Sequence, residues 1–399
     1  MGKVFQNSSD SIDLLVISVA CHTEVNRAIY RLFVKDQKKI AILLPRTIKI
    51  RNLTVPSDSK KIDDPEIIEE NLIGSNPRFQ LFTNQFKWLR KNKPKVILLD
   101  ADPISFNAIS TGFWCWFNGS RLCCISCENM SIGLIDNYKR KGFPSIFSTI
   151  LKIVLSFVSK RFVDTVFTIN NDGTKIFQAE KYNRVVQMPL GFDPEIFNIN
   201  QDVRLAKRKV LNVENFLIGF FGRVTKEKGI LVLLEALSTL KNLEWQLLMD
   251  EFSHYKSDFS YEVQDKINNL GLQERILYVN PTHSEMGEYI NAVDAVVMPS
   301  FSTKSWVEQY GRVAAESMAC GKVVIASNSG ALPFLIGDHG ILCEERNVNS
   351  LAFSIKKLIM DKGLHMGKLN PCEISQYALD QLSIYKQKEI MKKILFPAS

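Results

Sequence analysis

The stretch SWVEQYGRVAAESMACGKVVIAS, from Ser305 to Ser327, places a helix directly before a buried strand. Small and apolar residues predict a helix over 309–319, and Gly321 separates it from the strand KVVIAS. A short, unbroken apolar strand is typical of a parallel sheet that helices cover on both faces. Two glutamates stand in the same stretch, Glu308 at the expected start of the helix and Glu316 within it.

The same alternation of strand and helix extends along the whole chain. In the first half, apolar runs predict strands at 13–20 (DLLVISVA), 39–45 (KIAILLP), 95–100 (KVILLD), 121–126 (RLCCIS) and 164–169 (DTVFTI). The second half restarts with strands at 215–222 (NFLIGFFG), 245–249 (WQLLM), 275–279 (RILYV) and 294–300 (DAVVMPS). Strands that alternate with helices predict an α/β fold of two Rossmann-like, doubly wound domains.

A segment rich in turn formers and charge, between Pro189 and Asn215, divides these two series. We therefore expect an N-terminal domain over 1–197 and a second domain over 198–375. The stretch 376–399 reads as a helix with a basic end that packs back on the first domain. A chain of 399 residues is also longer than one hydrophobic core normally organises.

The charge of the chain is uneven. Residues 1–197 hold 27 lysines and arginines against 19 aspartates and glutamates, which accounts for the whole net charge of +8. This excess predicts an anionic partner for the first half, either an anionic membrane surface or an acidic acceptor. No basic stripe is interleaved with aromatic residues, so the sequence does not indicate a nucleic-acid partner.

One helix could carry the membrane contact. Residues 139–162, KRKGFPSIFSTILKIVLSFVSKRF, are apolar almost all round and flanked by cations. Their apolar part is shorter than the ~20 residues that span a bilayer. Two interpretations stay open, a helix buried on the sheet and a helix that touches a membrane. The basic first half favours the second, in a cytoplasmic protein peripheral to the inner face of the membrane.

The sequence does not predict a metal site. The eight cysteines are scattered, and the pair Cys124 and Cys127 has no second pair at zinc-ligand spacing, so structural thiols in a reducing cytoplasm are expected. Asp100 and Asp102 form a D-x-D motif, but so short a motif recurs by chance.

The segment GFFGRVTKEKGI contains a first candidate site. A strand ends at Gly222, and Arg223 and Lys228 flank the turn before the next helix. Glycine admits a ligand to the backbone, and the two cations suit a diphosphate. The segment is neither a Walker loop nor a G-x-G-x-x-G motif, and a solvated basic turn is the alternative.

The two glutamates of the opening stretch form a second candidate site. On a helix that begins near Glu308, Glu316 would lie about 12 Å away, too far for a pair that shares a proton. They could instead contact two hydroxyl-bearing parts of one ligand, whose charged middle faces the helix N-terminus at 310–312. Sugar, diphosphate and ribose in a row describe a nucleotide-sugar. The alternative is a surface helix with solvated glutamates.

Together, FFGRVTKEKG and PSFSTKSWVEQYGRVAAESMACGKVVIASNSGALPFLI resemble the retaining, GT-B-type glycosyltransferases of family 4, the glycosyl transferases group 1. The second segment follows the family's pattern, a serine after proline and then E-[GAQ]-[FY]-G-x-x-x-x-E, at Ser300, Glu308, Tyr310, Gly311 and Glu316. The resemblance covers nearly all of 216–360 and the first half more loosely. It implies the GT-B fold, two Rossmann-like domains that face a cleft.

The resemblance also implies a role for each motif residue. Arg223 and Lys228 would hold the donor diphosphate and stabilise the leaving group, Glu316 would bind the ribose, and Glu308 the transferred sugar. Glu308, Arg223 and Lys228 are therefore the expected catalytic residues. Neither a metal nor another cofactor is implied. The donor-binding set is Gly222, Arg223, Lys228, Ser300, Glu308, Tyr310, Gly311, Arg312 and Glu316.

The first half departs from the family pattern. ACHTEVNRAIY stands where members have a glycine-rich loop, and SCENMS stands where many have a histidine in an H-E-P motif. Residues of these two segments are the expected acceptor side: His22, Asn26, Glu128 and Asn129. For His22 and Asn26, a capping or core role is an open alternative.

The sequence thus predicts a retaining, metal-independent hexosyl-type glycosyltransferase that uses a UDP- or GDP-sugar. A glycan or lipid-linked acceptor in cell-envelope or polysaccharide biosynthesis fits this prediction. The alternative is a non-catalytic nucleotide-sugar-binding or scaffold protein of the same fold. An NAD-dependent oxidoreductase is disfavoured, because its phosphate fingerprint is missing.

Overall fold

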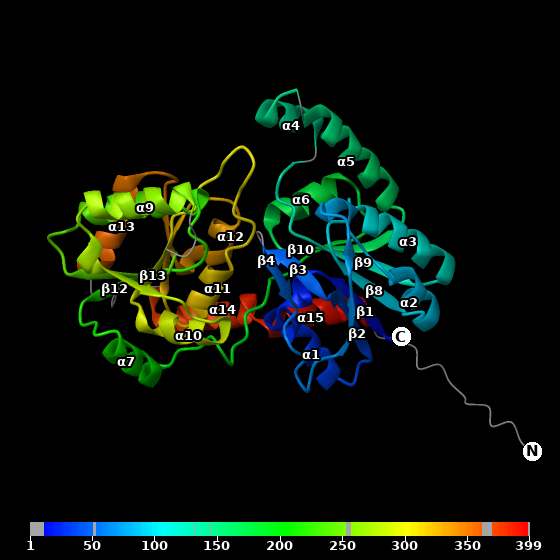
Figure 1. Cartoon of the computed structure of the whole chain (residues 1–399), viewed down its shortest axis with the longest axis horizontal. Coiled ribbons are helices and arrows are strands. Elements are labelled where there is room, and N and C mark those ends of the chain that lie inside the picture. The colour runs from blue at the N-terminus through cyan, green and yellow to red at the C-terminus, as the bar shows by residue number, and fades with distance from the viewer. Residues whose placement is uncertain are drawn as a thin grey trace, which may run out of the picture. The chain divides into compact units, whose positions relative to one another are not determined.

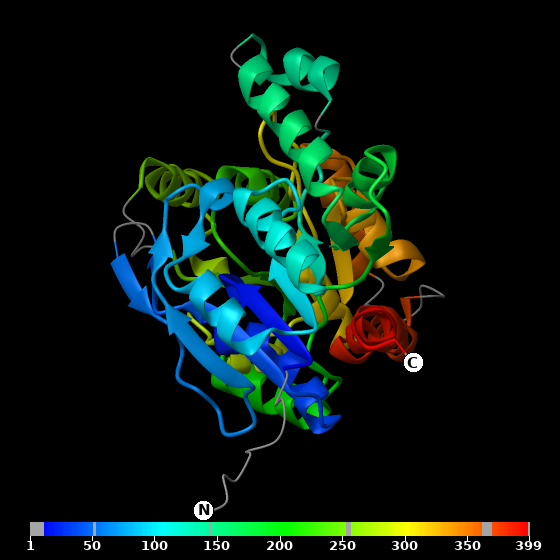
Figure 2. The ribbon, with the colours of Figure 1, turned by 90° about the vertical axis from the view of Figure 1, so that its right-hand side faces the viewer.

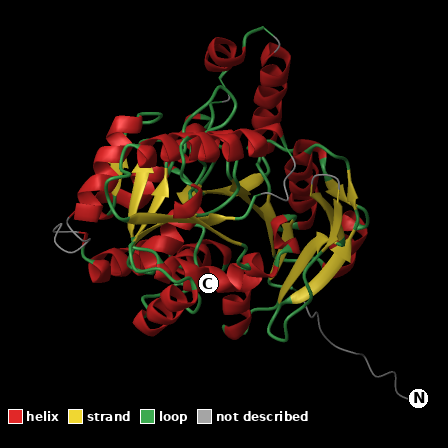
Figure 3. Cartoon of the chain, turned by 60° about the vertical axis from the view of Figure 1, so that its left-hand side comes forward, coloured by secondary structure: helices red, strands yellow, loops and turns green. Residues whose placement is uncertain are grey.

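The computed structural model describes residues 12–50, 53–131, 133–143, 145–252, 257–360 and 369–397. The chain forms two compact units (Figure 1). Unit 1 comprises Met1–Met188 and Lys388–Ser399, and unit 2 comprises Pro189–Gln387. Each unit is a parallel sheet with helices on both faces (Figure 3), which confirms the predicted α/β class with two doubly wound domains.

Unit 1 is built on a seven-stranded parallel sheet of order β11-β10-β9-β8-β1-β2-β5. Its strands are β1 (Leu14–Ser18), β2 (Ile40–Pro45), β5 (Glu66–Glu70), β8 (Val96–Asp100), β9 (Arg121–Ser126), β10 (Val163–Thr168) and β11 (Val185–Gln187). Two antiparallel hairpins lie beside it, β3 (Thr47–Ile50) with β4 (Leu53–Pro56) and β6 (Leu72–Ile73) with β7 (Leu81–Phe82). Its helices are α1 (Ala28–Lys35), α2 (Gln85–Asn92), α3 (Phe106–Asn118), α4 (Leu134–Lys141), α5 (Ser145–Ser159) and α6 (Asn171–Ala179).

Unit 2 contains a six-stranded parallel sheet of order β14-β13-β12-β15-β16-β17. The strands are β12 (Phe216–Phe220), β13 (Trp245–Asp250), β14 (Ile276–Val279), β15 (Ala295–Met298), β16 (Val323–Ser327) and β17 (Ile341–Cys343). Its helices are α7 (Gln201–Val210), α8 (Ile230–Ser238), α9 (Asp258–Asn269), α10 (His283–Ala292), α11 (Arg312–Ala319), α12 (Leu332–Ile336), α13 (Val348–Met360) and α14 (Pro371–Leu382). All the predicted strands of both units are present.

The strand order locates the ligand edge of unit 2. The chain runs outward from β12 through β13 to β14, then returns to add β15 on the other side of β12. In open α/β sheets, ligands bind outside the carboxyl ends of the strands at such a reversal. The loops that follow β12 and β15 meet at this switch point, and they are the two segments singled out from the sequence.

The unit boundary lies at Met188/Pro189 rather than at Phe197. Residues 189–197 belong to unit 2 because Phe192 exchanges backbone hydrogen bonds with 382–384: its amide donates to the Leu382 carbonyl at 3.3 Å, and the Ile384 amide donates to its carbonyl at 3.0 Å. The buried Phe197 ring also packs on His283, with ring centroids 5.4 Å apart.

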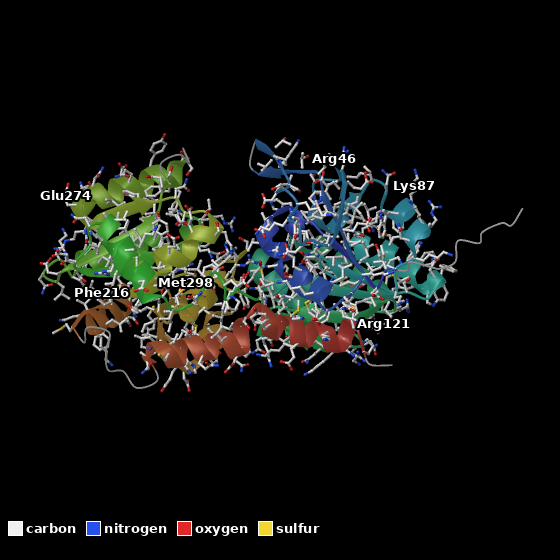
Figure 4. All side chains as sticks on the ribbon, turned by 90° about the horizontal axis from the view of Figure 1, so that it is seen from below. Arg46, Lys87, Arg121, Phe216, Glu274 and Met298 are labelled. Carbon is white, nitrogen blue, oxygen red and sulfur yellow. The ribbon has the colours of Figure 1, made fainter. Side chains whose placement is uncertain are left out.

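The returning helix is shorter than the predicted 376–399. Helix α14 stays in unit 2, where the Ser375 hydroxyl donates to the Ala319 carbonyl at 2.7 Å, so only the part of α15 (Ile384–Leu395) from Lys388 onward joins unit 1. There Lys388 pairs with Asp36 at 2.8 Å. Arg121 lies beside α15 (Figure 4) and donates to its Ile394 carbonyl at 2.8 Å. Residues 398–399 lie outside the described part.

No helix in the described ranges has both the length and the apolar character needed to cross a bilayer.

Candidate functional site

Two loops of unit 2 meet at the switch point. The amide of Phe301, after β15, donates to the carbonyl of Glu227, after β12, at 2.9 Å. Gly229 makes this approach possible, because a Cβ there would lie 2.0 Å from the Pro299 carbonyl oxygen and its φ of +77° is left-handed. Only glycine adopts that conformation without steric cost. The backbone thus brings the Gly222–Lys228 and Ser300–Gly311 segments side by side.

Lys228 and Glu308 form an ion pair across the two loops. Lys228 Nζ lies 2.5 Å from Glu308 Oε2, and the Ser300 hydroxyl donates to the same oxygen at 3.3 Å. The ammonium also lies 5.2 Å from the centre of the Trp306 ring. Glu308 is only 7% exposed, so the pair sits at the edge of the protein interior. Three of the predicted donor residues therefore share one cluster.

Glu308 lies in a loop, which corrects the predicted start of the helix. Helix α11 begins at Arg312, because its N-cap, Gly311, takes a left-handed φ of +87° that ends the loop. The Glu308 carbonyl accepts the Ala331 amide at 3.0 Å, and a Cβ on Gly330 would lie 2.3 Å from that carbonyl oxygen. Glycine at 330 thus fixes the Glu308 backbone, and the helical spacing of about 12 Å to Glu316 does not apply.

Both helices that follow the switch-point loops have an N-terminus suited to an anion. Helix α8 is preceded by Gly229 and α11 by Gly311, and in neither case does a side chain cap the first turn. The first amides of a helix lack intrahelical partners, and its dipole is positive at that end. Arg223 is exposed, and Gly222 has a φ of +108° with open space where a Cβ would lie. The edge can therefore take a phosphate.

Glu316 is buried in α11, with 3% of its surface exposed. Burial raises the pKa of its carboxyl to about 8, although the charge of Arg312 acts in the opposite direction. Among the described residues, no side chain donates a hydrogen bond to this carboxyl. A buried acid without donors is costly when ionised, and hydroxyl donors from a ligand would lower that cost.

Two further buried polar groups lie around the same edge. Asp250 Oδ1 is buried and has no hydrogen-bond partner in the part of the chain that the structure describes. Burial raises the pKa of the Tyr310 hydroxyl, although a hydrogen bond with the Leu190 backbone acts in the opposite direction. Asp250 Oδ2 accepts the Gly222 amide at 2.8 Å, and burial raises the pKa of Asp250. Buried polar groups are nearly always paired, so this concentration is itself a sign of a ligand site.

Sequence reasoning missed Asp250. The available signal was its place at the end of the strand next to the one that leads to Gly222, because carboxyl ends of parallel strands share one edge.

The residues predicted for the acceptor side make mostly local contacts. His22 Nδ1 lies 3.0 Å from the Val19 carbonyl oxygen, and the Asn26 amide donates to the Ala20 carbonyl at 2.8 Å. These contacts fit the capping alternative for both residues. Glu128 lies 3.6 Å from Arg78 and 3.5 Å from Lys152, while Asn129 follows Glu128 in the loop after β9.

A cavity of about 490 Å³ opens in unit 1 at the carboxyl ends of β1, β8 and β9. Its lining is partly apolar, and its polar lining includes Arg78, Asp100, Asp102, Asn107 and Cys127. None of the four predicted acceptor residues lines it. Arg78 Nη1 is buried and has no hydrogen-bond partner in the described ranges, and burial raises the pKa of Asp102. Arg78 is a second residue that sequence reasoning missed.

The D-x-D aspartates serve as acceptors for neighbouring strands. The Ser18 hydroxyl donates to Asp100 Oδ2 at 2.6 Å, and the Ser126 hydroxyl donates to Asp102 Oδ1. Within the described ranges, no three His, Cys, Asp or Glu side chains gather as they would around a metal ion.

The switch-point site lies in a part of the chain that matches a known protein family. Residues 203–370 match the family model described as Glycosyl transferases group 1. They form a group 1 glycosyl transferase domain. The matched segment contains β12, β15 and every predicted donor residue. The finer assignment to family 4 goes beyond this match.

Curated relatives match a little under half of this chain. D-inositol 3-phosphate glycosyltransferase of Stackebrandtia nassauensis is 28% identical over 189 residues, which are 45% of this chain and 42% of that protein. Lipopolysaccharide 1,2-N-acetylglucosaminetransferase of Salmonella typhimurium is 26% identical over 189 residues, 45% of this chain and 48% of that protein. The chain thus spans about half the length of the curated relatives it matches.

Solved structures extend the likeness beyond the group 1 domain. A glycosyltransferase from Rickettsia africae aligns with a TM-score of 0.71 and 18% identity over 98% of this chain and 100% of its own. Anabaena Alr3699/HepE in complex with UDP aligns with a TM-score of 0.71 and 18% identity, over 96% of this chain and 99% of its own. At these identities the likeness establishes the fold, which is the GT-B type.

Proposed function

We propose that the protein is a glycosyltransferase that moves a sugar from a nucleotide-diphosphate sugar to a hydroxyl acceptor. The observation that carries the proposal is the Lys228–Glu308–Ser300 cluster at the switch point of a group 1 domain. It combines a cation, two uncapped helix ends and buried hydrogen-bond acceptors. Such a set suits a ligand with a diphosphate between two hydroxyl-bearing rings.

Each residue has a distinct role in this proposal. Arg223 and Lys228 bind the diphosphate and stabilise the charge that develops on it as the sugar leaves. In other enzymes a bound metal ion has this role. Glu308 accepts hydrogen bonds from the sugar, and Glu316 accepts them from the ribose. The bond between the anomeric carbon and the phosphate oxygen breaks, and a bond to the acceptor oxygen forms. The acceptor proton passes to the leaving phosphate.

Retention of the anomeric configuration and independence from metal belong to the same proposal. Their support is the motif resemblance to retaining enzymes of family 4 and the two cations at the phosphate position. For the donor, a UDP-sugar is supported by the solved complex of Anabaena Alr3699/HepE with UDP. A GDP-sugar is the alternative donor, and a binding experiment with both nucleotide-sugars distinguishes them.

For the acceptor we propose a glycan or a lipid-linked molecule, in cell-envelope or polysaccharide biosynthesis at the cytoplasmic face of a membrane. The cavity of unit 1 supports this, because a lining of carboxylates, an arginine and apolar side chains suits a polyhydroxylated ring. The curated relatives are named for inositol phosphate and lipopolysaccharide acceptors. His22, Asn26, Glu128 and Asn129 stay predictions, as contacts for parts of the acceptor outside this cavity.

The test is a binding screen followed by a transfer assay. Calorimetry with UDP-sugars, GDP-sugars and NAD identifies the donor, and release of the nucleoside diphosphate with an acceptor measures turnover. Lys228→Ala should lower turnover about 100-fold or more while the protein stays folded. Lys226→Ala, an exposed lysine of the same loop, is the matched control. Equal turnover in both variants would refute the assignment.

The alternative is a non-catalytic nucleotide-sugar-binding or scaffold protein of the same fold. The absence of a histidine in SCENMS favours it. Donor binding without turnover on any acceptor tested would support this alternative, and NAD binding in place of nucleotide-sugar binding would refute both.

A further inference from the structure

Helix α5 packs on unit 1 through its polar residues. The Ser156 hydroxyl donates to Glu180 Oε2 at 2.8 Å, and the Ser159 hydroxyl lies 2.7 Å from the Tyr182 hydroxyl. Thr149 is buried on the same side, seven residues before Ser156. A surface helix of a globular protein normally turns its apolar stripe inward. In α5 the fully buried side chains are polar, and the most exposed large side chains are apolar.

The outward face of α5 is apolar. It is formed by five exposed side chains that recur at helical spacing: Phe147, Ile150, Leu151, Val154 and Phe157. Phe147 is 84% exposed, and Phe143, just before the helix, is also exposed. The interpretation of α5 as a helix buried on the sheet is therefore wrong for this face. Contiguous exposed apolar surface of this kind marks an interaction site.

Helix α3 lies beside α5 (Figure 1). Phe113, Trp116 and Phe117 of α3 form an aromatic cluster with Phe162. Trp116 and Phe117 are 66% and 65% exposed. Phe162, just beyond the end of α5, joins the two helices, with its ring centroid 6.0 Å from Phe113 and 6.4 Å from Trp116. Phe162 thus links the end of α5 to the exposed aromatic residues of α3.

Cations border this surface. The Arg161 guanidinium lies 4.3 Å from the centre of the Phe157 ring, and Lys160 Nζ lies 5.2 Å from it. Lys139 is exposed on α4, which packs on α5. Aromatic rings with cations beside them suit the boundary between lipid headgroups and acyl chains, and lysine and arginine attract anionic lipids.

We propose that the outward face of α5 and the aromatic cluster of α3 dock unit 1 on a bilayer that contains anionic phospholipid. The charge of the border is complementary to such a surface. The face lies on helices α4 and α5, which project from the rest of unit 1 (Figure 2). The proposal goes beyond the glycosyltransferase activity, because it concerns a surface of unit 1 and none of the proposed donor-binding residues of unit 2.

Vesicle flotation of the full chain tests the proposal. The wild type should float with vesicles of phosphatidylcholine and phosphatidylglycerol, and bind pure phosphatidylcholine vesicles and high-salt samples much more weakly. The double variant Phe147→Ser, Phe157→Ser should lose about tenfold or more of its partitioning. Phe334→Ser combined with Phe353→Ser, two exposed phenylalanines of unit 2, is the matched control and should bind like the wild type.

Two readouts separate the possible explanations. Because the substituted residues are exposed, the melting temperature and the nucleotide-sugar affinity should stay unchanged, so a loss of flotation cannot come from unfolding. Absence of wild-type binding to anionic vesicles would overturn the proposal. So would a wild-type dimer in light scattering that Phe147→Ser and Phe157→Ser convert to monomer, since a second copy would then cover the face. Neither result would affect the proposed transfer activity.

Discussion

Protonation of Glu316 should make nucleotide-sugar binding depend strongly on pH. Burial raises the pKa of this carboxyl to about 8, so most of it is neutral at pH 7 in the free protein. Ribose hydroxyls that donate to both of its oxygens favour the ionised form, because charge-assisted hydrogen bonds are the stronger ones. Binding should therefore release a proton.

The size of the effect follows from the pKa. If only the ionised form binds, about 1% of the protein is competent at pH 6 and about half at pH 8, so the affinity should rise about 50-fold between them. A nucleotide-sugar suits this assay because its diphosphate, esterified at both ends, does not titrate in this range. Calorimetry in buffers of different ionisation enthalpy measures both the affinity and the proton release.

Glu316→Gln separates this group from others that titrate. The variant should bind with little pH dependence and no proton release, whereas Glu235→Gln, a carboxylate of α8 that pairs with Lys266, should behave like the wild type. A pH-independent affinity of the wild type would refute the reasoning, as would an unchanged pH profile in Glu316→Gln.

The pH dependence of the stability of the free protein tests the raised pKa of Glu316 independently. Since the folded pKa of Glu316 lies above its ordinary value of 4.5, its neutral form contributes stability that is fully present below about pH 4.5. That contribution is lost as the pH rises toward 8. Relative to Glu316→Gln, the wild type should therefore lose stability between pH 5 and 8, and a constant difference would contradict the raised pKa.

Two further substitutions test the packing. Gly229→Ala would place a Cβ 2.0 Å from the Pro299 carbonyl oxygen and should lower both the melting temperature and the donor affinity, measured by thermal denaturation and calorimetry; wild-type values would contradict the close approach of the loops. Asp64→Asn leaves the fully buried Arg27, which now pairs with Asp64 at 2.9 Å, without a counter-charge. It should destabilise the protein by about 3–5 kcal/mol in urea unfolding, while the exposed Asp63→Asn should cost under about 1 kcal/mol; equal effects would contradict this account.

Much of the fold could be predicted from the sequence, because buried parallel strands are unbroken apolar runs. The strands of the two parallel sheets that escaped prediction, β5, β11 and β17, all lie at sheet edges, and β5 reads EIIEE and has no apolar pattern. The short hairpin strands β3, β4, β6 and β7 were not predicted either. Edge strands are short and charged because they face solvent. The start of α11 was also mispredicted, since the left-handed turn at Gly311 depends on the loop around it.

The site residues that could be predicted are those whose role shows in the residue type and in the position directly after a strand. Lys228, Glu308 and Ser300 stood out by residue type and position beside strand ends, and they meet in the structure. Asp250 and Arg78 did not, because their significance depends on neighbours that only the folded sheet supplies. Nor could the orientation of α5 be predicted, since a helix that is apolar nearly all round gives little indication of which face turns inward.

A crystal structure of the full chain with an intact nucleotide-sugar tests the central claim most directly. The account predicts the diphosphate within hydrogen-bonding distance of Lys228 and Arg223, the ribose on Glu316 and the sugar on Glu308, all at the carboxyl ends of β12 and β15. A nucleotide-sugar bound elsewhere in the molecule, with the Lys228–Glu308 pair untouched, would contradict it.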